Sequence, residues 1–407
     1  MTTPRVGWPA PTDFGTAPTP EDHERWAAAD RAARPVRLAR LRRRLAADGF
    51  DAYFGVRPEH ARYLTGFTLD DGEEKIAGNS GQFVVSGDEV VLFADSRYTI
   101  QARRQAPDAS VRDVYHDLPA RWAELASSLG AQRVAVEAGF VSHGLWTRLA
   151  AAAPDVELVA VDAWVEADRA VKEPAEIERI AAACAVADRA LARLLPDIRP
   201  GVTETELALR LEWGMRTDGA EALAFEVACL SGSEAALPHG APREHPVAAG
   251  TVLLFDFGAQ VDGYRSDMTR TLFVGEPSER DLSVYQSVTS AQAAVIGALE
   301  RAVAEAGDLP DGRALDSLAR SVIADAGFEP YAHGLGHGIG LATHELPTLG
   351  RRATEVALPS PTVFSVEPGV YVEGETGVRI EDLVMVDPAA RRFERLTRFP
   401  REVIVVG

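Results

Sequence analysis

Five residues in the C-terminal part of the sequence are of types that bind divalent metal ions. Asp256 and Asp267 flank one candidate hairpin turn, Glu367 and Glu381 flank another, and His337 lies in a glycine-rich run. Four carboxylates and one imidazole would balance the charge of two divalent cations. The set therefore predicts a dinuclear metal site, whose chemistry would be hydrolysis by a metal-bound hydroxide.

The two aspartates are spaced as neighbours across a hairpin. Residues 251–257 and 266–274 are predicted strands, and Asp262-Gly263 between them is a strong turn signal. The turn lies close to the midpoint between Asp256 and Asp267. We therefore expect the two side chains directly opposite each other or one pair removed, on one face of the sheet.

The two glutamates follow the same pattern. Residues 364–372 and 378–386 are predicted strands, and Gly374 lies at the midpoint between Glu367 and Glu381. Opposed glutamates in apolar strands would repel each other and lose hydration. Arg379 shares the face of Glu381 but supplies one positive charge, so metal ions are expected.

The kind of ligand narrows the choice of metal. A site rich in carboxylate oxygen with one imidazole suits Mn²⁺, which we favour, or Co²⁺, with Zn²⁺ and Fe²⁺ as alternatives. The absence of cysteine ligands disfavours a structural zinc site. The competing interpretation is an antiparallel sheet whose acids simply face water. Paired acids in two hairpins, together with a glycine-flanked histidine, favour the metal site.

Other histidines accompany the candidate ligand His337. His239, His245, His333 and His344 lie in the same half of the chain. With His337 binding metal, the others would be free for proton transfer or for hydrogen bonds to a substrate. We expect His245 to be an ordinary surface or core residue.

The composition excludes several classes of protein. The 407 residues suffice for two or three domains, and the net charge of −19 argues against a nucleic-acid or anionic-membrane partner. Cys184 and Cys229 lie in apolar contexts and are expected to be buried free thiols. No apolar run reaches the length of a membrane span, and the first residues do not resemble a signal peptide. We expect a cytoplasmic protein.

The periodicity divides the chain into an arm and two domains. Residues 1–34 are rich in Pro, Thr and Ala, which predicts an arm that packs irregularly or is partly disordered. An α/β domain is expected over 35–168 and an α+β domain over 169–407, where Pro174 starts a helix and Thr203 and Glu206 form a capping box. The predicted strands of the first domain cover 51–56, 82–86, 89–93, 133–138 and 156–161. The predicted helices cover 36–47, 119–129, 143–153, 174–195, 279–305 and 314–326.

Three segments resemble the pita-bread metallopeptidases, in particular the Xaa-Pro peptidases aminopeptidase P and prolidase. These segments are 252–274, 331–347 and 364–386, and they contain all five metal-ligand candidates. Residues 237–240, Leu-Pro-His-Gly, resemble the family's histidine segment before the first metal-binding strand. Residues 171–177, 63–67 and 95–98 also resemble family motifs, so the likeness extends over 36–407.

The resemblance implies a creatinase-like N-terminal α/β domain and a C-terminal pita-bread catalytic domain. It further implies that the five candidates bind two metal ions, with Asp267 and Glu381 bridging them. A hydroxide between the metals would attack the scissile carbonyl, and Glu367 would accept the proton. His239 and His344 would stabilise the tetrahedral intermediate and bind substrate.

The resemblance also implies that His333 lines the pocket and that Arg379, which would help to bind substrate, orients the groups around Glu381. The expected substrates are peptides with proline at the second position, and the expected assembly is a homodimer. The short connection between Glu367 and Glu381 is more like that of prolidases and short bacterial Xaa-Pro peptidases.

Two alternatives to an Xaa-Pro peptidase remain open. One is hydrolysis of a non-peptide amide at the same site, and the other is a catalytically inactive binding protein with the pita-bread fold. Because all five candidate ligands are present, the metal-free creatinases fit the sequence poorly. Methionine aminopeptidase is the nearest alternative fold, but it lacks the N-terminal domain.

Overall fold

A computed structural model describes residues 7–70, 72–73 and 76–407. The chain divides into two compact units. The N-terminal unit is Glu24–Asp168, and the C-terminal unit comprises the residues up to His23 together with Arg169–Gly407. All five metal-ligand candidates lie in the C-terminal unit.

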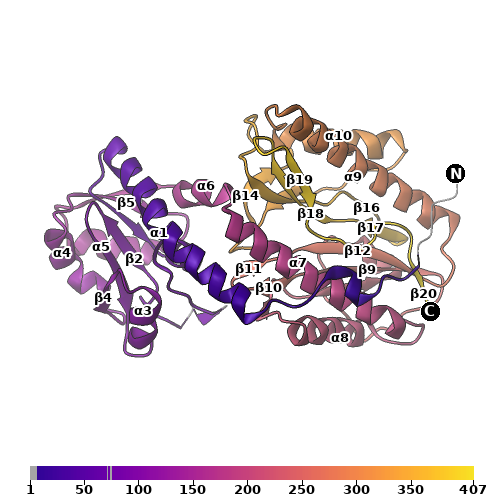
Figure 1. The fold of residues 1–407 in the computed structure, drawn as a ribbon, viewed down its shortest axis with the longest axis horizontal. Coiled ribbons are helices and arrows are strands. Elements are labelled where there is room, and N and C mark those ends of the chain that lie inside the picture. Colours follow the sequence, from indigo (N-terminus) through magenta and orange to yellow (C-terminus); the bar gives the residue numbers. More distant parts are fainter. Residues whose placement is uncertain (1–6, 71, 74–75) are drawn as a thin grey trace. The chain divides into compact units, whose positions relative to one another are not determined.

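One mixed six-stranded sheet organises the N-terminal unit (Figure 1). Its strand order is β4-β3-β2-β1-β5-β6, with β1 antiparallel to β2 and parallel to β5. The hairpin predicted around residue 87 is present, because β2 and β3 pair antiparallel. The strands are β1 (Ala52–Gly55), β2 (Phe83–Ser86), β3 (Val90–Ala94), β4 (Ser110–Asp113), β5 (Arg133–Glu137) and β6 (Glu157–Val161). The helices are α2 (Pro58–Thr65), α3 (Thr99–Gln105), α4 (Leu118–Ser128) and α5 (His143–Ala152), while α1 (Pro20–Asp48) and α6 (Trp164–Ala170) cross the unit boundaries.

The prediction of an irregular arm over residues 1–34 is wrong from Pro20 onward. Helix α1 runs without interruption for 29 residues and includes Pro35. Its start is capped reciprocally: the Thr19 hydroxyl accepts the Asp22 N–H at 3.2 Å, and the Asp22 carboxylate accepts the Thr19 N–H at 2.9 Å. Ala, Glu and Arg, which favour helices, outweigh the cost of one internal proline. Residues 1–6 of the predicted arm lie outside the described residues.

Residues 7–19 pack along the C-terminal unit. The Trp8 indole N–H donates to the Val405 carbonyl at 2.9 Å. The 3₁₀ helix η1 (Pro11–Phe14) buries Phe14, whose ring stacks on Phe399 with centroids 6.1 Å apart. Arg189 donates to the Phe14 carbonyl at 3.1 Å. These contacts give the segment a fixed course that its composition did not predict.

Antiparallel hairpins and long helices form the rest of the C-terminal unit (Figure 1). A four-stranded sheet has the order β20-β12-β9-β8, and a five-stranded sheet has the order β14-β13-β15-β18-β19. The helices are α7 (Pro174–Leu194), α8 (Glu204–Thr217), α9 (Glu279–Glu305) and α10 (Gly312–Asp325), with η3 (Leu195–Asp197) and η4 (Gly232–Ala236). The strands are β7 (Ala222–Leu223), β8 (Ala228–Ser231), β9 (Thr251–Phe257), β10 (Ala259–Val261), β11 (Tyr264–Arg265), β12 (Met268–Val274), β13 (Gly336–Gly338), β14 (Glu345–Leu349), β15 (Thr362–Val366), β16 (Gly369–Val372), β17 (Thr376–Arg379), β18 (Asp382–Asp387), β19 (Arg392–Arg395) and β20 (Val405–Val406).

One apolar core fixes these hairpins in place. It joins buried residues of α9 and α10 to residues of β9, β12, β15 and β18. Removing this much apolar surface from water holds the strands rigidly, so that residues at their ends keep defined positions. The Thr203–Glu206 capping box predicted for α8 is present, with the Glu206 N–H donating to the Thr203 hydroxyl at 3.1 Å.

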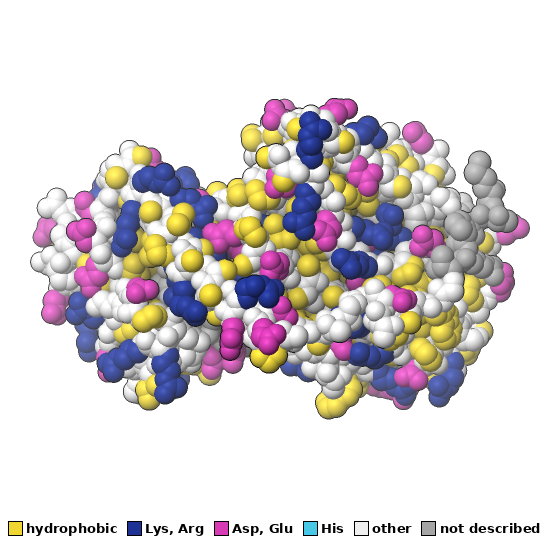
Figure 2. Space-filling view, in the orientation of Figure 1, with side chains coloured by type: hydrophobic (Ala, Val, Ile, Leu, Met, Phe, Trp, Pro, Cys, Tyr) yellow, Lys and Arg dark blue, Asp and Glu magenta, His cyan; other side chains and the backbone are white. Residues whose placement is uncertain are grey.

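The surface carries charges of both signs. On the face shown in Figure 2, Lys and Arg side chains are interspersed with Asp and Glu over both units. Among the described residues, we find no helix long and apolar enough to cross a bilayer.

Candidate metal centre

The aspartate hairpin has the predicted register. β9 and β12 pair antiparallel with Asp256 opposite Thr269. Asp267 immediately precedes β12, two residues before Thr269. It therefore lies diagonally opposite Asp256 on the same face of the hairpin, one same-face pair removed. The inner strands β10 and β11 continue the same register and close at Asp262-Gly263, with Val261 opposite Tyr264. This arrangement was one of the two predicted from spacing.

The glutamate hairpin is built in the same way. β15 and β18 pair antiparallel with Val366 opposite Asp382. Glu367 and Glu381 continue this register by one residue, which places them opposite each other. The inner strands β16 and β17 turn at Gly374, whose φ of 76° suits glycine. The prediction of an opposed pair centred on Gly374 is confirmed.

Backbone hydrogen bonds bring the two hairpins and His337 together. The Glu381 N–H donates to the Thr269 carbonyl at 3.1 Å, and the Glu367 N–H donates to the Leu335 carbonyl at 2.8 Å. Gly336 permits the close contact between the glycine-rich run and the glutamate hairpin, because a Cβ at position 336 would lie 2.0 Å from the Ser365 carbonyl oxygen. The glycine-rich run therefore lets His337 approach the glutamate hairpin.

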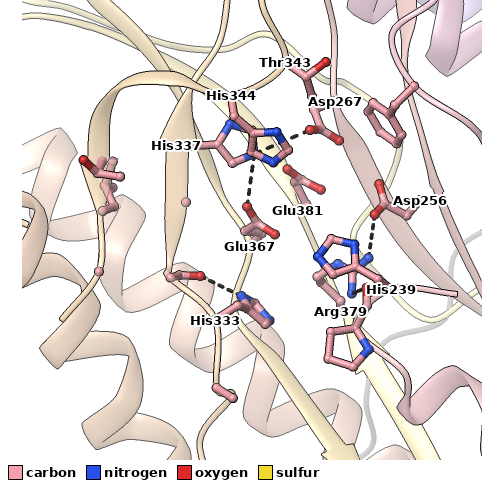
Figure 3. Close-up of a pocket in the computed structure, with 18 of the residues that line it drawn as sticks. His239, Asp256, Asp267, His333, His337, Thr343, His344, Glu367, Arg379 and Glu381 are labelled. Carbon is pink, nitrogen blue, oxygen red and sulfur yellow. Dashed lines mark hydrogen bonds and ion pairs between the residues drawn. The ribbon is translucent and has the colours of Figure 1, made fainter. Parts of the chain in front are cut away.

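All five metal-ligand candidates face one cavity of about 920 Å³ (Figure 3). His337 Nε2 lies 3.6 Å from Asp267 Oδ2 and 3.4 Å from Glu367 Oε1. Asp267, His337 and Glu381 each offer a ligand atom within 4.8 Å of the others. The cavity also contains the remaining four predicted site residues, His239, His333, His344 and Arg379.

The hydrogen bonds of His337 identify which ring nitrogen is available. Nδ1 lies 3.0 Å from the Gly338 carbonyl oxygen, which can only accept, so Nδ1 carries the proton. Burial lowers the pKa of His337 and keeps the ring neutral. Nε2 therefore presents a lone pair between Asp267 and Glu367, as a metal ligand would.

The carboxylates are too closely placed to be charged together without cations. Burial, reinforced by the neighbouring carboxylates, raises the pKa of Asp267 and of Glu381 well above the usual range. Burial also raises the pKa of Glu367 to about 7, although Arg379 opposes the shift. Among the described residues, the buried oxygens Asp256 Oδ1 and Glu381 Oε1 have no hydrogen-bond partner. This donor set fits two divalent cations.

Arg379 lies among the carboxylates, where it was expected to orient the groups around Glu381. Its Nη2 donates to Asp256 at 2.7 Å, a contact that the sequence did not predict. Its Nε donates at 2.9 Å to the Thr269 hydroxyl, which in turn donates to Glu381 at 2.7 Å. Arg379 therefore contacts Asp256 directly and reaches Glu381 through Thr269.

His333 is held beside Arg379 by directed hydrogen bonds. Its Nδ1 lies 2.7 Å from the Gly334 carbonyl oxygen and so carries the proton. Burial lowers the pKa of His333 to about 4, so the ring is neutral at pH 7. Nε2 then accepts from the Tyr371 hydroxyl at 2.9 Å, and that oxygen accepts from Arg379 Nη1 at 2.8 Å.

His239 and His344 face the same cavity from other segments (Figure 3). The His344 ring lies 4.2 Å from the His337 ring, centroid to centroid. Burial lowers the pKa of His344 to about 4, and His337 and His239 add to the shift. His344 is therefore a neutral hydrogen-bonding group at pH 7.

Several residues of the site were missed in the sequence. Ser365 accepts the His337 N–H at 3.1 Å and donates to Glu367 at 3.1 Å. Thr269 and Ser365 each lie two residues from a metal-ligand candidate, so strand alternation could have placed them on the same face. Arg351 and Arg352 also line the cavity, but no sequence pattern connects their loop to the hairpins.

Models of two known protein families match this chain. The model of metallopeptidase family M24 matches residues 178–388, and that of the creatinase/prolidase N-terminal domain matches residues 37–171. Uncharacterized peptidase YqhT of Bacillus subtilis is 33% identical over 91% of this chain and 100% of its own length. The Xaa-Pro dipeptidase of Pyrococcus furiosus is 31% identical over 90% of this chain and 99% of its own.

Solved structures agree with the sequence comparisons. The X-Pro aminopeptidase of Thermotoga maritima superposes with a TM-score of 0.79 and is 34% identical, covering 91% of this chain and 99% of its own. The Xaa-Pro dipeptidase of Bacillus anthracis gives a TM-score of 0.81 at 32% identity, over 91% and 99% of the two chains. The chain belongs to metallopeptidase family M24, the pita-bread peptidases, and carries a creatinase/prolidase N-terminal domain.

Proposed function

We propose that this metallopeptidase hydrolyses the peptide bond before proline by means of two bound divalent cations. The observation that carries the proposal is the convergence of four carboxylates and a neutral imidazole in one cavity. The relatives named Xaa-Pro dipeptidase and X-Pro aminopeptidase support the choice of proline. Mn²⁺ is the favoured metal, and Co²⁺, Zn²⁺ and Fe²⁺ also suit the ligands.

The five candidates would hold the metals, with Asp267 and Glu381 shared between them. The cations would supply a water activated for attack and a positive charge for the carbonyl oxygen. Glu367 would accept the proton of that water, because it faces the same cavity as the other ligands, and the Ser365 hydroxyl, which donates to its Oε1, orients the carboxylate.

The three other histidines of the cavity would position the substrate. His344 and His239 face the cavity beside the metal ligands and would donate hydrogen bonds to the peptide. His333 would line the pocket wall, with the Gly334 carbonyl fixing its tautomer and Tyr371 donating to its other ring nitrogen. Arg379 would hold Asp256 in place through their hydrogen bond and would help to bind the substrate.

The charge left over after metal binding favours a short substrate. Two divalent cations would neutralise the four carboxylates, leaving Arg351, Arg352 and Arg379 as positive groups that line the cavity, against the one further acid Glu226. A dipeptide presents its free carboxylate close to the scissile bond, whereas a longer peptide presents a neutral amide there. We therefore infer a preference for Xaa-Pro dipeptides over Xaa-Pro-Yaa peptides.

Paired kinetics test both the activity and this preference. Protein loaded with Mn²⁺ should cleave Ala-Pro with a higher kcat/KM than Ala-Pro-Ala, and should not cleave Ala-Ala comparably. Replacing Arg351 and Arg352 by alanine should lower kcat/KM for Ala-Pro roughly 10- to 100-fold, the usual cost of a lost charge-assisted hydrogen bond. The same replacements should lower kcat/KM for the amidated dipeptide Ala-Pro-NH₂ far less, because this substrate has no free carboxylate.

Arg313→Ala is the matched control, because Arg313 is an exposed arginine of the same unit, paired with Glu355. It should leave both substrates within twofold of the wild type. No turnover of any Xaa-Pro substrate by protein with two metals bound would refute the proposed activity. Cleavage of a small non-peptide amide in its place would favour the alternative reaction.

A further inference from the structure

A buried ion cluster lies directly behind the loop that carries His344. Glu345 follows His344 in the chain and begins β14, and its side chain is 2% exposed. Its Oε1 accepts from Lys172 Nζ at 2.7 Å, and its Oε2 contacts Arg169 Nη2. Arg169 and Lys172 are 2% and 1% exposed, so three ionised groups meet away from water.

The cluster is organised to hold one carboxylate. Lys172 Nζ also donates to the Arg169 carbonyl at 2.6 Å, and the Lys172 N–H donates to the Pro361 carbonyl at 2.8 Å. Burial alone would raise the pKa of Glu345, but Arg169 and Lys172 outweigh it and lower that pKa. The glutamate is therefore charged at pH 7 and bound on both oxygens.

The loop folds closely onto this carboxylate. A Cβ on Gly340 would lie 2.5 Å from Glu345 Oε1, so glycine is needed for the approach. On the other side of His344, Thr343 donates to the Ala224 carbonyl at 3.1 Å and accepts from Arg265 Nη1 at 3.1 Å. Both neighbours of His344 are thus anchored to separate segments of the C-terminal unit.

His344 itself depends on these neighbours for its position. Among the described residues, no hydrogen bond holds its ring, which projects into the cavity beside His337. A group that donates to a substrate must be placed within a fraction of an ångström, and a misplacement of 1 Å can cost about 100-fold in rate. The backbone on both sides of His344 must supply that precision.

We propose that Glu345, clamped by Arg169 and Lys172, is a positioning residue that sets the place of His344 in the active site. The inference rests on the proposed function, since it assigns His344 a contact with the substrate. Glu345 is not itself a catalytic residue, because its carboxylate is turned toward the ion cluster. Its effect on catalysis passes entirely through His344.

A double-mutant cycle separates this role from simple stabilisation. Glu345→Gln should lower kcat for Ala-Pro roughly 10- to 100-fold, with both metals still bound and KM changed less. In the His344→Ala background, the same substitution should change kcat by no more than about twofold. An equal loss in both backgrounds would overturn the inference.

Two variants guard against a trivial outcome. Glu204→Gln removes the charge of another buried carboxylate of this unit, one held by Arg243 and Ser231 away from the cavity. Glu204→Gln should leave kcat within twofold of the wild type, even if it lowers the Tm as much as Glu345→Gln does. Lys172→Met leaves Arg169 on Glu345 and should give a smaller loss of kcat in the same direction as Glu345→Gln.

Histidine ring NMR on the metal-free protein provides a readout that does not depend on activity. Glu345→Gln should shift or broaden the Cε1–H signal of His344 and leave that of His333 in place. If the wild type does not cleave Xaa-Pro peptides, the proposed function fails while this readout still tests the position of His344. An unchanged His344 signal would refute the inference even in an active enzyme.

Discussion

Asp267→Asn is expected to remove at least one metal ion and to lower kcat/KM roughly 1000-fold, or about 4 kcal/mol of transition-state stabilisation. Asp267 lies on the aspartate hairpin, within reach of His337 and of Glu381 on the other hairpin. The amide keeps the size of the carboxylate but loses the charge that two cations would share. Elemental analysis and Ala-Pro kinetics measure both effects.

The same substitution should act in the opposite direction on metal-free protein. Without cations, burial and then the charges of Glu381, Asp256 and Glu367 raise the pKa of the Asp267 carboxyl. Asparagine removes that repulsion, so the Tm in chelator should equal or exceed that of the wild type. A misfolded variant would instead lose Tm under all conditions.

Asp387→Asn is the matched control for Asp267→Asn. Asp387 ends β18 of the glutamate hairpin, and its carboxylate accepts the Ala390 N–H at 3.1 Å, outside the cavity. Metal content and activity should stay within twofold of the wild type. If Asp267→Asn retained two metals and full activity, Asp267 would not be a ligand.

Metal removal should destabilise the protein more strongly at pH 8 than at pH 6. The folded-state pKa values of Asp267 and Glu381 are raised, and that of Glu367 is about 7, against about 4.5 in an unfolded chain. Metal-free folded protein therefore holds protons that the unfolded chain has released. Its free energy of unfolding is greatest below the unfolded pKa and falls as pH rises through the folded pKa. For Glu367 alone the loss over the whole range is on the order of 3 kcal/mol, of which about 1 kcal/mol falls between pH 6 and pH 8.

Cations reverse this dependence because they bind the deprotonated ligands. At 100 times the dissociation constant, one bound ion adds about 2.7 kcal/mol to the free energy of unfolding. Thermal unfolding with EDTA and with Mn²⁺, at pH 6 and pH 8, measures the difference. The gain in Tm on adding Mn²⁺ should be larger at pH 8. A gain independent of pH would mean that these carboxylates do not hold the metal.

The metal centre could be predicted closely because its geometry follows from local rules. Side chains alternate across a strand, and a turn fixes the register of its hairpin. Asp262-Gly263 and Gly374 therefore sufficed to place each carboxylate pair. The meeting of the two hairpins came from resemblance, since no local pattern states that the Glu381 N–H will bond to Thr269.

The unpredicted parts depend on contacts between distant segments. Helix α1 was missed before residue 36 because the Pro and Thr content of residues 1–20 obscured the Thr19–Asp22 cap and the helix-forming run behind it. Glu345 and Lys172 are 173 positions apart, and no local pattern in either segment indicates that their side chains pair. Arg351 and Arg352 reach the cavity on a loop whose path is set by tertiary packing.

The most direct test of the dinuclear site is anomalous X-ray scattering from crystals of the wild-type protein grown with Mn²⁺. Two peaks are expected, both within ligand distance of Asp267 and Glu381, one also contacting Asp256 and the other His337 and Glu367. A single peak, or peaks away from these residues, would contradict the account.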